Sequence, residues 1–194
     1  MTSHTNISRR EFMTRLGLLG TLAISYPAAA LAERRQSDIK HSLPVWLEDP
    51  VWKTIAQVQE TLFPAGKDIP GAGDIGAAIY LHKAIENPNA DGADRDFIFR
   101  GTGWLDELAQ QRYTRNFIQL TEKEQEKIIE ETVQTTAGRN WVSMLLTYIL
   151  EALLSEPVYG GNPGGTGWLW LEHQPGYPTP AADKTWDQLL QRRA

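Results

Sequence analysis

The stretch from Pro157 to Trp170 places the tightest constraint on how this chain can fold. Its residues include five glycines and two prolines. Glycine raises the entropic cost of ordering the backbone, and proline lacks the amide hydrogen that helices and central strands use, so this density predicts a loop. Three large aromatic residues lie in the same run: Tyr159, Trp168 and Trp170. Because flexible linkers are rich in small polar residues, we expect an ordered loop that these side chains pin in place.

The loop follows the most apolar segment beyond the N-terminal region, Trp141 to Leu154, which we expect to form a buried helix. The buried helix would position the ordered loop at the protein surface. Two roles remain open for the loop: a structural cap over the core, or a docking surface for a partner. The candidate docking residues are Tyr159, Gly160, Gly161, Asn162, Gly167, Trp168 and Trp170.

The first 32 residues have the order of an export signal. A paired arginine comes first, followed by the short apolar run Leu16 to Ile24 and a small-x-small cleavage site. The arginine pair matches the twin-arginine type of bacterial leader. We predict a twin-arginine signal peptide over residues 1–32 and a periplasmic location; the alternative is a basic amphipathic helix that stays attached. The residues that carry the signal are Arg9, Arg10, Phe12, Ala30 and Ala32.

Twin-arginine export implies cargo that folds before translocation, often around a cofactor, yet this chain shows no cofactor site. The chain has no cysteine, which excludes covalent haem, iron–sulfur clusters and thiolate zinc. Its four histidines are scattered without metal-ligand spacing. We therefore expect no cofactor and no metal in this chain, and infer that the leader serves a partner that carries a cofactor.

Composition indicates an ordinary globular domain. The chain is 41% hydrophobic with seven tryptophans. Its formal net charge is −5, and removing the arginine-rich leader makes it more acidic. An acidic chain argues against nucleic acid or an anionic membrane surface as a partner. We expect a flexible tail over residues 33–48 and a single helical domain over residues 49–194.

Several local signals predict helices. Asp49 and Pro50 form a start signal, and the helix should end at Phe63 because Pro64 follows. Thr121–Glu124 has the sequence of a capping box and marks a second helix start. Three glycines are expected to interrupt helices: Gly101 and Gly103 within residues 93–113, and Gly138 ahead of residues 140–154.

No segment alternates with the period of a strand. The predicted fold class is therefore all-α, a small irregular helical bundle with a Gly/Pro/Trp-rich C-terminal loop region.

Residues Gly71 to Gly76 match the dinucleotide-binding fingerprint letter for letter. That site requires a preceding buried strand, and Gly66 to Pro70 cannot form one. We therefore predict a turn here, with Asp74 capping a helix that runs to about Glu86.

No catalytic constellation is visible. No serine lies in a nucleophile elbow, and the glutamates around Glu122 to Glu131 have the pattern of a solvated helix face. Glu172 and His173 form a conceivable acid–base pair, but a charged rim around the aromatic residues explains them more simply. We predict no catalytic residues.

The chain resembles the gluconate 2-dehydrogenase subunit 3 family. The C-terminal resemblance rests on Tyr159-Gly160-Gly161-Asn162, Gly167-Trp168 and Pro175-Gly176. The earlier resemblance rests on Phe63-Pro64 and Pro70-Gly71-Ala72, and the twin-arginine leader is also typical.

The resemblance implies a small, helical, non-catalytic subunit of a periplasmic, membrane-associated dehydrogenase complex. The partner would be a catalytic flavoprotein that holds FAD and oxidises a sugar or sugar acid, with a cytochrome c subunit carrying haem c as a further possible member. This chain would support export and stability of the flavoprotein. The competing hypothesis is a free-standing periplasmic carbohydrate-binding module that uses Trp168, Trp170 and Tyr177. An independent enzyme is a third, weaker hypothesis.

Overall fold

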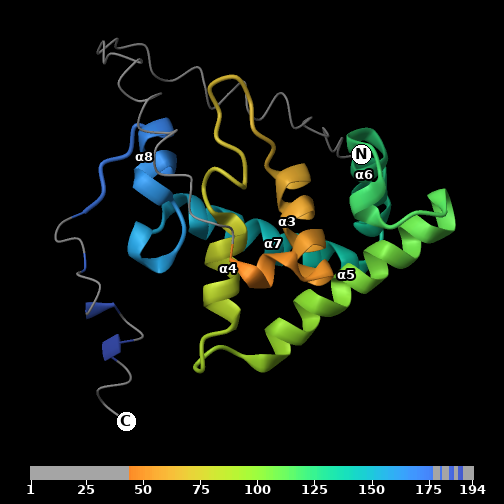
Figure 1. Cartoon of the computed structure of the whole chain (residues 1–194), viewed down its shortest axis with the longest axis horizontal. Coiled ribbons are helices and arrows are strands. Elements are labelled where there is room, and N and C mark those ends of the chain that lie inside the picture. Colours follow the sequence, from red (N-terminus) through yellow and green to blue (C-terminus); the bar gives the residue numbers. More distant parts are fainter. Residues whose placement is uncertain (1–43, 177–179, 181–183, 186–187, 190–194) are drawn as a thin grey trace, which may run out of the picture. The chain divides into compact units, whose positions relative to one another are not determined.

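The computed structural model describes residues 44–176, 180, 184–185 and 188–189. Helices and turns make up the described chain, and no strand occurs within those ranges, so the all-α prediction is confirmed (Figure 1). The α-helices are α3 (Pro50–Leu62), α4 (Ala77–Ile85), α5 (Gly92–Tyr113), α6 (Glu122–Thr132), α7 (Thr136–Leu154) and α8 (Thr166–Trp170). The 3-10 turns are η1 (Val45–Glu48), η2 (Phe117–Gln119), η3 (Pro157–Tyr159) and η4 (Pro163–Gly165). The predicted leader, including Arg9, Arg10, Phe12, Ala30 and Ala32, lies outside the described residues.

The first described element, η1, precedes residue 49, the predicted start of the helical domain. Residues Val45–Glu48 form η1, which the sequence assigns to the flexible tail. The indole of Trp46 stacks on the imidazole of His82, with ring centroids 3.8 Å apart, and meets Trp52 edge-on at 5.0 Å. Burying these aromatic faces against one another fixes the end of the tail.

The predicted caps at Asp49 and at Thr121–Glu124 are confirmed. Asp49 caps α3, because its Oδ1 accepts a hydrogen bond of 2.8 Å from the Val51 amide, and the helix ends at Leu62 with the predicted Phe63 as its C-cap. At the start of α6, Thr121 and Glu124 form the capping box. These ends depend on side chains within a few residues of one another, so local sequence predicts them well.

The predicted cap at Asp74 is wrong. Helix α4 begins after Gly76, which adopts the left-handed conformation (φ 68°), and the Asp74 carboxylate instead accepts a 2.9 Å hydrogen bond from the Gly71 amide. Asp74 thus closes the turn that precedes the helix. Gly76 lies against the C-terminal loop: a Cβ on it would stand 3.1 Å from the Gly160 carbonyl oxygen.

Glycines do not interrupt α5 or α7, contrary to prediction. Gly101 and Gly103 lie within one continuous helix. Gly138 lies in the first turn of α7, where its amide donates to the Thr135 hydroxyl at 2.9 Å. Two of these glycines allow close approach, because a Cβ on Gly101 would collide with the Trp141 indole and one on Gly138 with the Thr132 carbonyl.

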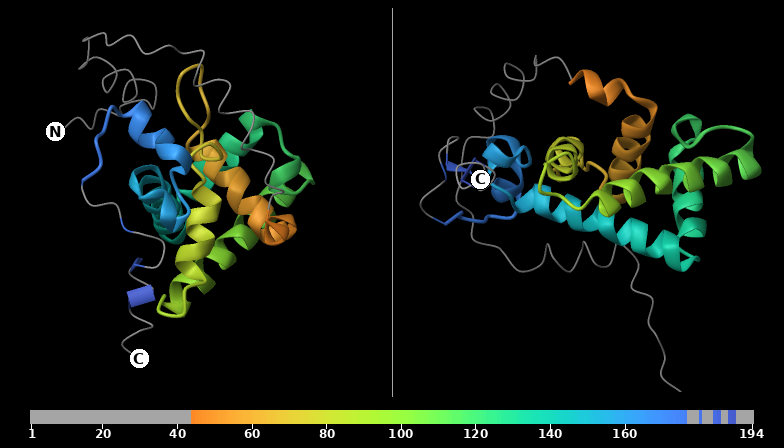
Figure 2. Two further views of the ribbon diagram at one scale, coloured as in Figure 1. Left: turned by 60° about the vertical axis from the view of Figure 1, so that its left-hand side comes forward. Right: turned by 90° about the horizontal axis from the view of Figure 1, so that it is seen from below.

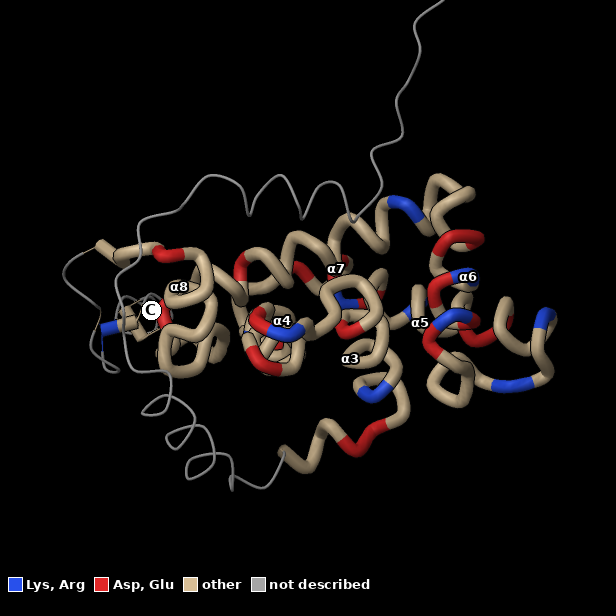
Figure 3. Tube along the Cα trace, turned by 90° about the horizontal axis from the view of Figure 1, so that it is seen from above, with Lys and Arg blue, Asp and Glu red and all other residues tan. Residues whose placement is uncertain are grey.

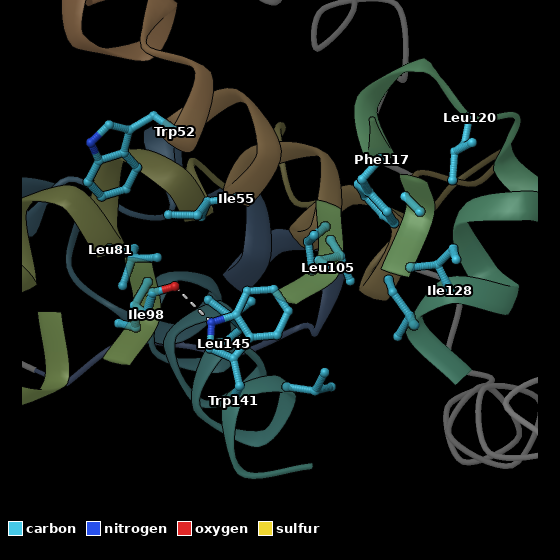
Figure 4. Close-up of a cluster of buried hydrophobic side chains, with 14 of the residues drawn as sticks. Trp52, Ile55, Leu81, Ile98, Leu105, Phe117, Leu120, Ile128, Trp141 and Leu145 are labelled. Carbon is cyan, nitrogen blue, oxygen red and sulfur yellow. Dashed lines mark hydrogen bonds between the residues drawn. The ribbon is translucent and has the colours of Figure 1, made fainter. Parts of the chain in front are cut away.

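The core forms between α3, α4, α5, α6 and α7 (Figure 4). Its centre is Trp141 of α7, which is fully buried and donates an indole hydrogen bond of 2.9 Å to the Ile98 carbonyl of α5. A second apolar cluster joins α7 to the loop after α3 and includes Ile75, Ile149 and Leu153. This second cluster supports the C-terminal segment.

Candidate docking site

Asn162 joins three segments at the end of α7. Its backbone N–H donates to the Ile75 carbonyl at 2.7 Å, and its side-chain Nδ2 donates to the Ser155 carbonyl at 3.1 Å. Its side-chain oxygen accepts from the Gly167 amide at 2.6 Å. Asn162 is fully buried and has a left-handed backbone (φ 50°), a conformation that asparagine tolerates better than most residues. Of the predicted docking residues, Asn162 therefore acts by shaping the loop from within.

Two glycines let this loop lie directly on α7. A Cβ on Gly161 would stand 2.6 Å from the Ala152 carbonyl oxygen, and one on Gly167 would collide with the Leu153 carbonyl. Both residues are buried. Close backbone packing on a helix end thus explains two of the five glycines in this stretch.

The loop after α3 meets the C-terminal segment although the two are far apart in sequence. Ile75 and Gly76 contact the Gly160–Asn162 segment through the hydrogen bond and close approach described above. Phe63 meets Trp170 edge-to-face, with ring centroids 6.0 Å apart and planes at 74°. The loop after α3 and the C-terminal segment therefore form one structural unit on α7.

The prediction that this stretch contains no helix is wrong. The short helix α8 forms within it, and η3 and η4 each place a proline at their first position, where no amide hydrogen is needed. Gly164 and Gly165 have positive φ and turn the chain into α8. Packing of Gly167 on α7 supplies the contact that a five-residue helix lacks on its own.

The tryptophans pin the segment, as the sequence predicts. The Trp168 indole N–H donates to the Leu154 carbonyl, the last of α7, at 2.9 Å. Trp170 is half-buried in the second cluster, and Tyr159 is also half-buried. Tyr177, the third residue of the carbohydrate-binding hypothesis, lies outside the described residues. Trp168 therefore combines a structural bond with a partly exposed indole, and its docking role stays a prediction.

A tyrosine group borders the site on the α4 side. Burial raises the pKa of the Tyr80 hydroxyl to about 12, and the nearby Glu151 carboxylate adds to the rise. Burial also raises the pKa of Tyr148, with Asp94 and Glu151 contributing. Both phenols therefore stay neutral at ordinary pH and offer hydrogen bonds beside Glu151.

The exposed leucines of α7 are not among the residues predicted from the sequence. This helix was expected to be buried, and one face is: Trp141, Leu145, Ile149 and Leu153 lie in the core. The residues one position further on, Leu146, Leu150 and Leu154, are exposed. The signal was present as three apolar doublets four residues apart, Leu145-Leu146, Ile149-Leu150 and Leu153-Leu154, which give a helix two apolar stripes.

The described residues contain no group of three His, Cys, Asp or Glu side chains placed to hold a metal ion. Within the same ranges, no helix is long and apolar enough to cross a membrane.

Comparison with known proteins gives one family. The sequence model of gluconate 2-dehydrogenase subunit 3 matches residues 49–176, well over half of the chain. Searches among curated proteins and among solved structures gave no match. The matched range runs from the Asp49 cap of α3 to just past α8, so it contains the whole docking site.

Proposed function

The chain belongs to the gluconate 2-dehydrogenase subunit 3 family, and we propose that it is the non-catalytic small subunit of a periplasmic, membrane-associated FAD-dependent dehydrogenase for a sugar or sugar acid. Its role is to support export and stability of the flavoprotein subunit. The family match carries this proposal, because the family is a subunit of a dehydrogenase and so implies a dehydrogenase partner.

The site geometry supports a binding role for the C-terminal segment. Buried hydrogen bonds through Asn162 hold the backbone in one conformation, while the neighbouring Leu169 of α8 is 63% exposed. A rigid segment that presents apolar side chains loses little entropy when a partner binds. This is the arrangement expected of a docking element.

The cofactors are assigned to the partners. FAD belongs in the flavoprotein subunit, and haem c belongs in a cytochrome c subunit where the complex has one. The residues of this chain would contact protein surfaces, and none is assigned to catalysis.

The export role rests on the leader. A twin-arginine leader on a small subunit would carry a partner that folds around FAD in the cytoplasm. Changing Arg9 and Arg10 together to lysine should leave both this chain and the flavoprotein in the cytoplasm. Mature protein in the periplasm of the double variant would contradict the twin-arginine assignment.

The direct test is co-purification of the full chain with a C-terminal tag from the periplasm. We expect a flavoprotein to co-purify in fixed stoichiometry, with a flavin absorption band that is lost when the two chains are separated. Flavin that remains with the isolated small subunit would contradict the non-catalytic assignment, and a tagged chain recovered alone would contradict the subunit role.

The carbohydrate-binding alternative receives less support from the site. Stacking on a sugar needs an open aromatic face, but Trp170 is half-buried against Phe63. Trp168 has part of its indole exposed. Titration of the isolated chain with sugars tests this alternative, which requires tryptophan fluorescence to change on addition.

A further inference from the structure

Helix α7 has an outward apolar stripe that no described element covers. Leu146, Leu150 and Leu154 are four residues apart and therefore lie along one face. Leu150 is 54% exposed and Leu154 51% exposed. In the right-hand view of Figure 2 the other described helices lie on one side of α7, and no described element lies on the opposite side.

The stripe is also uncharged. Between Arg139 and Glu151 the sequence has no charged residue, although this part of α7 is exposed along one face. The Thr147 hydroxyl on this face donates to the Ser143 carbonyl at 3.0 Å, so its hydrogen is already used. Exclusion of charge from an exposed helix face is typical of the centre of a protein interface.

The segment that adjoins the end of the stripe carries only acidic charge. From residue 140 to residue 183 the sequence has no lysine or arginine, while Glu151, Glu156 and Glu172 lie within the described part. Helix α8 itself is uncharged, and the chain immediately before and after it has acidic positions and no basic ones (Figure 3). One oxygen of Glu156 is buried and has no hydrogen-bond partner among the described residues. The side chain of Lys83 from α4 lies over Gly160 at the edge of this segment.

Glu172 adds a strained residue to the acidic segment. It ends α8 in the left-handed conformation (φ 52°), where the His173 amide donates to the Trp168 carbonyl at 2.8 Å. Glycine is the usual residue at this position of a helix end, because a side chain there is unfavourable.

We propose that the leucine stripe of α7 and the acidic segment beside it form the contact for the dehydrogenase subunit, and that the partner presents an apolar strip bordered by lysine and arginine. This inference rests on the proposed function. Apolar area supplies most of the affinity, and the acidic side chains select a basic partner surface. A second copy of this chain would bring the same acidic segments together across a two-fold axis, so charge repulsion disfavours it.

The first test changes the stripe. The full complex is purified, its subunits are separated, and binding of the flavoprotein subunit to variants of this chain is measured. Leu150→Asp and Leu154→Asp should each weaken binding by about a hundredfold or more, because each puts a charge into the apolar centre. Ile118→Asp is the matched control: Ile118 is 42% exposed, lies on η2 away from the stripe, and should leave the affinity unchanged. All three variants should keep the wild-type melting temperature.

The second test changes the charge. The double variant Glu151→Lys, Glu172→Lys should weaken binding by about tenfold or more at low salt and reduce its salt dependence. The control, Glu126→Lys with Glu130→Lys, reverses the same number of exposed carboxylates on α6 and should bind as the wild type does.

The outcomes separate this inference from the proposed function. If the wild-type subunits form a complex but the stripe variants bind normally, the surface assignment is refuted and the proposed function stands. Equal losses of binding affinity in the test and control variants also refute the surface assignment. If the stripe variants abolish a homodimer of this chain while flavoprotein binding is unchanged, a second copy is the occupant and the inference is wrong. A wild-type chain that forms no complex refutes both.

Discussion

The close contact between Gly101 of α5 and Trp141 of α7 leads to a sharp prediction about stability. A Cβ on Gly101 would overlap the indole ring at its nitrogen, and that nitrogen makes the 2.9 Å hydrogen bond to the Ile98 carbonyl. Gly101→Ala therefore forces the fully buried Trp141 to move. Gly103 lies two residues further along the same helix, and a Cβ added there would have no atom within 4 Å, so the same substitution meets open space.

The two substitutions should change the free energy of unfolding in opposite directions. Overpacking a core costs about 1–3 kcal/mol, and breaking a buried hydrogen bond costs about 1–3 kcal/mol more. Replacing glycine by alanine inside a helix returns about 1 kcal/mol. We therefore expect Gly101→Ala to lower the free energy of unfolding by about 1–5 kcal/mol, and Gly103→Ala to raise it by up to about 1 kcal/mol.

Urea denaturation of residues 33–194, followed by circular dichroism, measures both changes. Subtracting the two results removes the helix propensity that the substitutions share. A Gly101→Ala protein as stable as Gly103→Ala would refute the close approach of α5 and α7, and with it the reason for a glycine at this position.

Three further predictions follow from buried polar groups. Gln59 is buried, and neither polar atom of its side-chain amide has a hydrogen-bond partner among the described residues. Gln59→Leu should therefore raise the free energy of unfolding by about 1–3 kcal/mol, and a lower value in a urea titration would show that the amide is satisfied. Asn162→Ala removes two side-chain hydrogen bonds at the end of α7 and should cost about 2–4 kcal/mol, measured in the same way; an unchanged midpoint would contradict its joining role. Burial, with Glu151 contributing, raises the pKa of Tyr80 from 10.0 to about 12, so the folded state holds this proton more tightly than the unfolded state does. The stability that this proton contributes is complete below pH 10 and is lost as pH rises through 12; Tyr80→Phe should flatten this fall in melting temperature, and an unchanged slope would refute the assignment.

Local sequence determined the helical class and the starts of α3 and α6. Asp49 with Pro50, and Thr121 with Glu124, satisfy the first amides of α3 and α6 through side chains only a few residues away. Such caps act before any tertiary contact forms, so they can be predicted from neighbouring residues. The aromatic residues in the glycine-rich stretch likewise indicated an ordered segment.

Tertiary structure decided what the glycines do. By local propensity Gly101 and Gly138 weaken a helix, yet both lie inside one, because neighbouring segments approach too closely for a side chain. Helix α8 is stabilised in the same way, since the packing of Gly167 on α7 offsets the poor propensity of its sequence.

Tertiary structure also decided which face of α7 is exposed. The doublets Leu145-Leu146, Ile149-Leu150 and Leu153-Leu154 make two apolar stripes, and the sequence alone does not say which stripe the core takes. Trp141 and its bond to Ile98 orient the helix so that Leu145, Ile149 and Leu153 face inward. The second stripe is left outside because a helix in a small domain packs on one side only, and that geometry creates the candidate docking surface.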